Sequence, residues 1–154
     1  MERTHRIMFV CHGNICRSPM AEFLLKDMIK KEGLADRFVI ASAGTSREEI
    51  GNPVHQGTRK KLAQDHISAA GKYAVPLTKE DYEKYDLILG MDRANISNIL
   101  RIIGSDPQEK VHRLLDFTEL PRDIADPWYT GDFEITYAEI KAGCAALLKH
   151  LRRF

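Results

Sequence analysis

Residues 7–18 read IMFVCHGNICRS, an apolar run that leads into a short loop beginning at Cys11 and ending with Arg17 and Ser18. Pro19 and the apolar residues after it are typical of a helix start, so we expect this loop to join a buried parallel strand to a helix N-terminus. In α/β sheets such a junction lies at the carboxyl edge of the strands, where anions bind. This stretch therefore predicts the fold class and the position of the site.

The rest of the chain alternates short apolar runs with amphipathic stretches. We expect strands at residues 5–11, 37–43, 86–91 and 111–115, and helices at 18–32, 53–64, 78–85, 94–103 and 134–151. This order predicts an α/β fold of three layers, a flavodoxin/Rossmann-like, doubly wound parallel sheet with helices on both faces. Residues 116–133 form the longest stretch without clear periodicity, and such loops are often functional.

Length and composition limit the class of protein. A chain of 154 residues, 44% hydrophobic and 29% charged, predicts one domain over residues 1–154 with its own core. No apolar run approaches a membrane span, no apolar signal segment precedes the first strand, and three cysteines suit a reducing compartment. We therefore expect a cytoplasmic protein with no membrane partner. A formal net charge of +1 with interspersed charges predicts no nucleic-acid partner, and the oligomeric state stays open.

The spacing between Cys11 and Arg17 has a chemical reason. Five intervening residues let the backbone curl with its N–H groups inward, while the guanidinium closes the rim as a planar, two-pronged donor. A tetrahedral phosphoryl group fits such a cup. The same donors stabilise a negative sulfur, so we expect Cys11 to be a thiolate nucleophile to which Ser18 donates its hydroxyl. Gly13 and Asn14 suit the tight, partly left-handed backbone of the curl.

Three other interpretations of this loop are weaker. A nucleotide-binding P-loop ends in Gly-Lys-Ser/Thr, which this loop lacks. Cys11, His12 and Cys16 suggest a zinc site, but no second ligand pair follows and Cys144 stands alone. A buried structural cysteine beside a surface arginine is the plainest alternative, and it leaves the combination of Gly, Asn, Arg and Ser at this junction without a reason. We expect neither a metal nor another cofactor.

Residues 10–22 resemble the signature of the low-molecular-weight protein tyrosine phosphatases, whose catalytic loop is C-x5-R-[ST]. Segments 42–45, 78–82, 86–88, 91–95 and 126–129 are also similar to family segments in the family's order, so the resemblance covers nearly the whole chain. It implies a four-stranded sheet, for which we expect the order 2-1-3-4. It also implies hydrolysis of phosphotyrosine in proteins, or of small aryl phosphates, through a phosphocysteine intermediate.

A phosphocysteine forms only if the leaving oxygen receives a proton, which requires a carboxylic acid opposite the nucleophile. Spacing alone leaves five candidates, namely Asp116, Glu119, Asp123, Asp126 and Asp132. The resemblance selects Asp126, because residues 126–129 match the family segment that carries the general acid. It also assigns Trp128 and Tyr129 to the wall that packs against the substrate ring.

The resemblance implies supporting roles as well. Asn14 and Ser42 belong to the hydrogen-bond network that fixes the loop, and Asp92 orients Arg17, although an acidic residue after a strand often only caps the next helix. Cys16 can form a reversible disulfide with Cys11 under peroxide, or it can simply support the loop as a small buried side chain. The phosphate-binding loop comprises His12, Gly13, Asn14, Ile15, Cys16 and Ser18.

The chain departs from the family at several positions. His12 stands where relatives commonly have a small or apolar residue, and both a role in binding acidic phosphopeptides and a solvent-facing position remain open. Residues 47–49, Arg-Glu-Glu, make polar a wall that is often aromatic. Residues 71–74 lack the histidine that braces the loop in many eukaryotic members, so we expect a different bracing network.

Related chemistries are separated by single features. Arsenate reductases need a late cysteine pair that this chain lacks. Protein-arginine phosphatases carry Thr where Ile15 stands, and a non-hydrolytic phosphocysteine carrier or phosphopeptide-binding module would lack a proton donor such as Asp126. A protein-tyrosine phosphatase is therefore the favoured function, with the arginine phosphatase and the carrier as alternatives.

Overall fold

A parallel sheet of four strands forms the centre of the protein, whose computed structural model describes residues 3–152. The strands are β1 (His5–Cys11), β2 (Phe38–Gly44), β3 (Leu87–Gly90) and β4 (Val111–Arg113). Their order in the sheet is β2-β1-β3-β4, which confirms the predicted order 2-1-3-4. The sheet order reverses next to β1, so the carboxyl end of β1 lies at the switch point where α/β proteins bind ligands.

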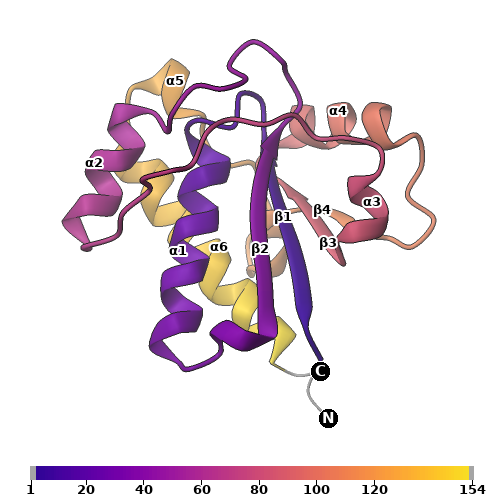
Figure 1. The fold of residues 1–154 in the computed structure, drawn as a ribbon, viewed down its shortest axis with the longest axis horizontal. Helices are drawn as coiled ribbons and strands as arrows, with labels where there is room; N and C mark the ends of the chain where they lie inside the picture. The colour runs from indigo at the N-terminus through magenta and orange to yellow at the C-terminus, as the bar shows by residue number, and fades with distance from the viewer. Residues whose placement is uncertain (1–2, 153–154) are drawn as a thin grey trace.

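Helices cover both faces of the sheet, as Figure 1 shows, and confirm the three-layer prediction. On one side lie α1 (Arg17–Lys31), α2 (Gln56–Gln64) and α6 (Phe133–Leu151), and on the other lie α3 (Asp81–Lys84) and α4 (Arg93–Ile103). The short helix α5 (Pro127–Thr130) lies beyond the carboxyl ends of the strands. Two 3₁₀ turns, η1 (Ala35–Arg37) and η2 (Leu114–Phe117), complete the elements.

The apolar run at the start of the chain is explained by burial on two sides. Ile7, Phe9 and Cys11 of β1 belong to the core beneath α1 and α6. Met8 and Val10 point the other way, into the core that α4 covers with its apolar face. Because successive residues of a strand alternate between faces, a central parallel strand needs an unbroken apolar sequence.

Three predicted elements have a boundary that differs from the structure by more than one residue. The helix predicted at 53–64 begins at Gln56, because Pro53 forms a β-bridge and the His55 side chain accepts the N–H of Gly57 as a cap. The helix predicted at 78–85 is shortened to Asp81–Lys84, since the N–H of Thr78 donates to Asp81 Oδ2 (2.9 Å) and Tyr85 is extended.

Corrections also apply near the fourth strand. β4 ends at Arg113 instead of residue 115, because the turn η2 begins at Leu114 and its third residue, Asp116, accepts the Arg113 N–H (3.0 Å). The stretch 116–133, predicted to be irregular, contains α5, which Asp126 caps and Pro127 begins. A helix of four residues is too short for hydrophobic periodicity to indicate it.

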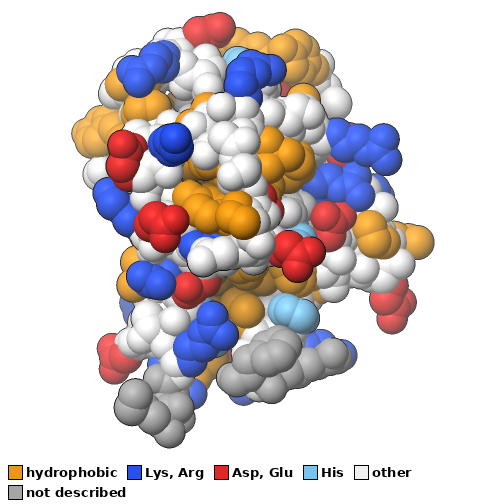
Figure 2. All heavy atoms as spheres, turned by 90° about the vertical axis from the view of Figure 1, so that its right-hand side faces the viewer, with side chains coloured by type: hydrophobic (Ala, Val, Ile, Leu, Met, Phe, Trp, Pro, Cys, Tyr) orange, Lys and Arg blue, Asp and Glu red, His pale blue; other side chains and the backbone are white. Residues whose placement is uncertain are grey.

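Charges of both signs are distributed over the face that carries α3 and α4. Figure 2 shows basic and acidic side chains interspersed there with small hydrophobic areas. Within residues 3–152, no helix has the length and apolar character needed to cross a bilayer.

The last helix packs unusually close to the end of the sheet at Gly143. A Cβ placed on Gly143 would lie 2.6 Å from Cγ of Leu114, a fully buried residue of η2. Carbon atoms do not approach that closely without a shift of one partner, so the contact between α6 and η2 depends on the missing side chain.

We expect Gly143→Ala to lower the free energy of unfolding by about 1–2 kcal/mol, because overpacking outweighs the helix propensity that alanine adds. Urea denaturation measures this change. Leu114→Ala should cost less in the Gly143→Ala background than in the original chain, since it removes the colliding atoms. Additive effects of the two substitutions, or a stabilising Gly143→Ala, would contradict the argument.

Candidate active site

The loop between β1 and α1 curls tightly against the end of β2. Asn14 has φ 59°, the left-handed conformation that was expected of it, whereas Gly13 has no positive φ. Gly13 instead gives room, because a Cβ there would lie 3.3 Å from Cγ of Glu49. At the end of β2, a Cβ on Gly44 would lie 2.9 Å from the carbonyl oxygen of His12. The absence of a side chain at Gly13 and at Gly44 thus lets the loop pack closely against the segments beside it.

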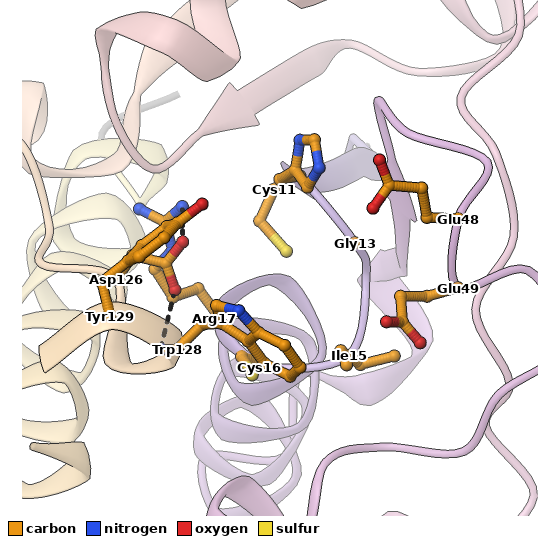
Figure 3. Close-up of a pocket in the computed structure, with 11 residues that line it drawn as sticks. Cys11, Gly13, Ile15, Cys16, Arg17, Glu48, Glu49, Asp126, Trp128 and Tyr129 are labelled. Atoms are coloured by element: carbon orange, nitrogen blue, oxygen red, sulfur yellow. Dashed lines mark hydrogen bonds and ion pairs between the residues drawn. The ribbon is translucent and has the colours of Figure 1, made fainter. Parts of the chain in front are cut away.

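The sulfur of Cys11 lies at the bottom of this loop beside the hydroxyl and the backbone N–H of Ser18. Its Sγ is 2.9 Å from the hydroxyl oxygen of Ser18 and 3.4 Å from the Ser18 backbone N–H, which comes from the first turn of α1. Cys11 is only 3% exposed, and Figure 3 shows its sulfur pointing into the pocket. A negative sulfur is stabilised by these donors and by the helix N-terminus.

Arg17 is buried beside the sulfur and is held by three acceptors. Nη1 donates to Asp92 Oδ2 (2.8 Å) and to the carbonyl oxygen of Ile124 (2.9 Å), and Nη2 donates to Asp126 Oδ2 (3.3 Å). Burial by itself would lower the pKa of Arg17, but the negative charges of Cys11, Asp126 and Asp92 raise it above its ordinary value. The guanidinium is therefore a permanent positive charge at the site.

Asp92 combines two roles that the sequence left as alternatives. One carboxylate oxygen accepts from Arg17, and the other accepts the N–H of Asn95 (2.8 Å) as the cap of α4. Because α4 fixes the carboxylate by this bond, Asp92 holds the guanidinium at a defined orientation.

A buried network fixes the loop from below. Asn14 Nδ2 donates to the hydroxyls of Ser18 (2.8 Å) and Ser42 (3.0 Å), and its Oδ1 accepts the N–H of Val75 (3.0 Å). The network continues to Glu22, whose Oε1 accepts from the Ser42 hydroxyl at 2.6 Å. Asn14 and Ser42 thus lie together, as the resemblance implied.

Sequence reasoning missed Glu22 and underrated Lys72. Glu22 is 5% exposed on α1, and a charged residue within the apolar stretch 20–25 was the available signal. Lys72 lies in the segment that lacks the family's histidine, and its Nζ donates to the carbonyl oxygen of Ser42 (2.9 Å). A lysine therefore supplies the brace that the sequence left open.

The pocket above the sulfur has two different walls, as Figure 3 shows. Asp126, Trp128 and Tyr129 come from the start of α5 on one side, while Glu48 and Glu49 face them from the loop after β2. The pocket is lined by Cys11, His12, Gly13, Ile15, Cys16, Arg17, Glu48, Glu49, Asp126, Trp128 and Tyr129. His12 is an exposed member of this set.

Trp128 and Tyr129 are exposed by 59% and 84%, so both stand at the rim and outside the core. The ring of Trp128 meets His55 edge to face at 5.9 Å, and His55 in turn stacks on Phe133 at 5.3 Å. His55, which the sequence did not point to, therefore supports the aromatic wall.

Among the five acidic candidates, only Asp126 lines the pocket. Asp116 and Asp123 each pair with Arg113 at 3.0 Å, and Asp132 caps α6 through the N–H of Ile135 (3.1 Å). Glu119 is exposed and does not line the pocket. Its place in the pocket thus distinguishes Asp126 from the other four acids.

The other two cysteines lie in different surroundings. Cys16 is buried in the loop, where burial and the negative charge of Cys11 raise its pKa to about 12. Cys144 is fully buried on α6, which raises its pKa strongly. In the described part of the chain, all three cysteines are free, and His, Cys, Asp and Glu side chains form no group that could hold a metal ion.

Comparison with known proteins agrees with this geometry. The family model described as low molecular weight phosphotyrosine protein phosphatase matches residues 6–154. The low molecular weight protein-tyrosine-phosphatase YfkJ of Bacillus subtilis is 40% identical over 149 residues, covering 96% of this chain and 96% of that protein. The corresponding PtpA of Staphylococcus epidermidis is 35% identical and covers 94% of this chain and 92% of its own length.

Similarity extends to the three-dimensional structure. The crystal structure of YfkJ superposes with a TM-score of 0.94 at 39% identity, over 97% of this chain and 96% of that one. A protein tyrosine phosphatase from Entamoeba histolytica, solved with Hepes in its active site, gives a TM-score of 0.89 at 27% identity, covering 97% of this chain and 98% of that one. This chain therefore belongs to the low molecular weight phosphotyrosine protein phosphatase family.

Proposed function

We propose that this protein hydrolyses phosphotyrosine in protein substrates, and small aryl phosphates, with Cys11 as nucleophile, Arg17 as phosphate ligand and Asp126 as general acid. The observation that carries the proposal is their convergence on one pocket: a sulfur among hydrogen-bond donors, a buried guanidinium and a carboxyl group opposite them. A phosphoryl group between these residues meets a nucleophile on one side and a proton donor on the other.

In the first step, the Cys11 thiolate attacks phosphorus in line with the bond to the phenol oxygen. The sulfur–phosphorus bond forms as the phosphorus–oxygen bond breaks, and protonated Asp126 gives its proton to the departing phenol. Loop N–H groups and Arg17 hold the equatorial oxygens of the transition state.

The contacts of Arg17 divide into firm and exchangeable ones. Its Nη1 bonds to Asp92 and Ile124, at 2.8 and 2.9 Å, are shorter than the Nη2 contact with Asp126 at 3.3 Å. We infer that the phosphate replaces Asp126 on Nη2, which frees that carboxyl group to take up its proton and face the leaving oxygen.

In the second step, the Asp126 carboxylate takes a proton from water, and the water oxygen attacks phosphorus. The sulfur–phosphorus bond breaks, inorganic phosphate leaves and Cys11 returns to its thiolate, which the Ser18 hydroxyl stabilises. Neither step needs a metal or another cofactor.

The walls of the pocket support an aryl substrate. The exposed rings of Trp128 and Tyr129 offer apolar surface to a phenyl ring that extends outward from the phosphate cup, and Ile15 adds an apolar side chain within the loop. A shorter phosphoserine would leave this surface uncovered.

We further propose that residues 1–154 form one domain and that the protein works in the cytoplasm. A thiolate nucleophile needs a reducing compartment, because oxidation removes its activity.

Two substitutions test the catalytic roles together. Cys11→Ser should reduce phosphate release from a phosphotyrosine peptide to background, because the hydroxyl is not ionised at neutral pH. Asp126→Asn should lower kcat/KM for the same peptide about a hundredfold or more, the usual contribution of a general acid. Its effect should be smaller on an aryl phosphate whose phenol is acidic, because that leaving group needs less protonation.

Asp132→Asn is the matched control, since it removes a half-buried carboxylate of the same segment that caps α6 and does not line the pocket. It should retain kcat/KM. Full activity of Cys11→Ser, or an equal loss in Asp126→Asn with both leaving groups, would refute the assigned roles. Phosphoserine and phosphoarginine peptides, assayed beside phosphotyrosine, test the substrate class.

We also propose that Cys16 protects Cys11 from irreversible oxidation. Peroxide oxidises the Cys11 thiolate to a sulfenic acid, and the Cys16 thiol condenses with it to a disulfide with release of water. Both side chains belong to the same short loop.

Brief peroxide treatment should therefore yield a Cys11–Cys16 cross-linked peptide in mass spectrometry, and a thiol reductant should restore activity. Cys144, fully buried in the core, serves as the internal control and should stay a thiol. In a Cys16→Ser variant, peroxide should inactivate the enzyme irreversibly. Recovery of that variant to the level of the original protein would exclude the protective role.

A further inference from the structure

We infer that Glu22 is a positioning residue that fixes the direction of a buried hydrogen-bond chain, so that Ser18 presents its hydroxyl hydrogen to Cys11. The chain runs from Glu22 through Ser42 and Asn14 to Ser18 and ends at the sulfur. This inference rests on the proposed function in taking Cys11 as the nucleophile.

The two outer ends of the chain allow only one direction of donation. The Val75 backbone N–H can only donate, and it points at Asn14 Oδ1 (3.0 Å). The Glu22 carboxylate can only accept, and it takes the Ser42 hydroxyl hydrogen at 2.6 Å. Both ends are therefore fixed by chemistry as well as by geometry.

These ends determine every bond between them. Because Val75 holds the oxygen of the Asn14 amide, both N–H hydrogens of that amide face the hydroxyls of Ser18 and Ser42. Ser42 can accept one of them because its own hydrogen is given to Glu22. If the Ser42 hydrogen pointed back at Asn14, two donors would meet and the amide would lose its orientation.

Ser18 is the last link before the sulfur. Its oxygen accepts from Asn14, which leaves its own hydrogen free for an acceptor. Cys11 Sγ lies 2.9 Å away, whereas the carbonyl oxygen of Ala43 is a distant alternative at 3.5 Å. A thiolate can only accept, so the chain as built supplies a hydrogen-bond donor to a sulfur in that form.

Two lysines face the Glu22 carboxylate, which is almost fully buried. Lys26, one turn further along α1, donates to Oε2 at 2.5 Å, and Lys72 lies 3.9 Å from Oε1. Burial lowers the pKa of Lys72, an effect that the charge of Glu22 opposes. Burial raises the pKa of Tyr85, and the charges of Asp81 and Glu22 add to this effect. Two neighbouring cations match the role of Glu22 as a hydrogen-bond acceptor for the Ser42 hydroxyl.

The direction in which the pH of Cys11 ionisation moves when Glu22 is removed separates this role from a purely electrostatic one. Removing a negative charge near Cys11 would by itself favour the thiolate and move its ionisation to lower pH. Loss of the hydrogen-bond direction weakens the donor to the sulfur and moves ionisation to higher pH. The two explanations therefore predict opposite shifts.

The test measures the rate of Cys11 alkylation by iodoacetamide against pH, with the modified peptide identified by mass spectrometry. In Glu22→Met, the midpoint of this curve should move upward by about one pH unit, as expected when a hydrogen bond to a charged group is weakened. Glu22→Gln, which keeps a carbonyl acceptor, should recover part of the shift. An unchanged or lowered midpoint in Glu22→Met would overturn the inference.

Ser42→Ala cuts the same chain without changing any charge, and it serves as the second variant should Glu22→Met fold poorly. It should also raise the midpoint, and adding Glu22→Met to it should raise the midpoint no further. An unchanged midpoint in Ser42→Ala, or a further upward shift in the double variant, would contradict a role exerted through Ser42.

Asp27→Asn is the matched control, because Asp27 lies on α1 but pairs at the surface with Lys31. Its midpoint should equal that of the original protein. The alkylation curve does not depend on turnover, so a failed inference is distinguishable from a failed assignment of Cys11, which the phosphatase assay of Cys11→Ser reports.

Discussion

The buried guanidinium of Arg17 is the contact on which the site depends, because it joins three segments that are distant in sequence. It stands at the start of α1, and it binds Asp92 after β3 and both Ile124 and Asp126 in the long segment before α6. Each of these segments leaves the sheet at its carboxyl edge. A single side chain therefore converts the common edge of a parallel sheet into one pocket.

Charge compensation explains why this arrangement is stable without a bound ligand. A buried cation is costly unless it is paired, and here two carboxylates and a carbonyl oxygen satisfy it. The same principle applies beneath the loop, where Glu22 is balanced by Lys26 and Lys72. Opposite charges are thus paired both at the pocket and beneath the loop, and we expect a bound phosphate to pair with Arg17 as a further anion.

The sequence predicted the sheet and the catalytic loop well because their signals are local. The apolar run in β1 and the spacing from Cys11 to Arg17 depend on neighbouring residues only. The position of Asp126 depends on a four-residue helix that has no periodic signature, so spacing left five acids and only the resemblance separated them. Glu22 and Lys72 meet across 50 positions of sequence through tertiary packing, which no local pattern encodes. Only the folded structure shows that these two residues pair.

Nucleophilic attack by Cys11 is the central claim, and the phosphorylated intermediate tests it most directly. The protein is mixed with a phosphotyrosine peptide, quenched in acid during turnover, digested and analysed by mass spectrometry. We predict one phosphoryl group on the peptide that contains Cys11, absent in Cys11→Ser. Continued turnover with phosphate bound to another residue, or with no phosphate bound to the protein in the Asp126→Asn variant as well, would contradict the account.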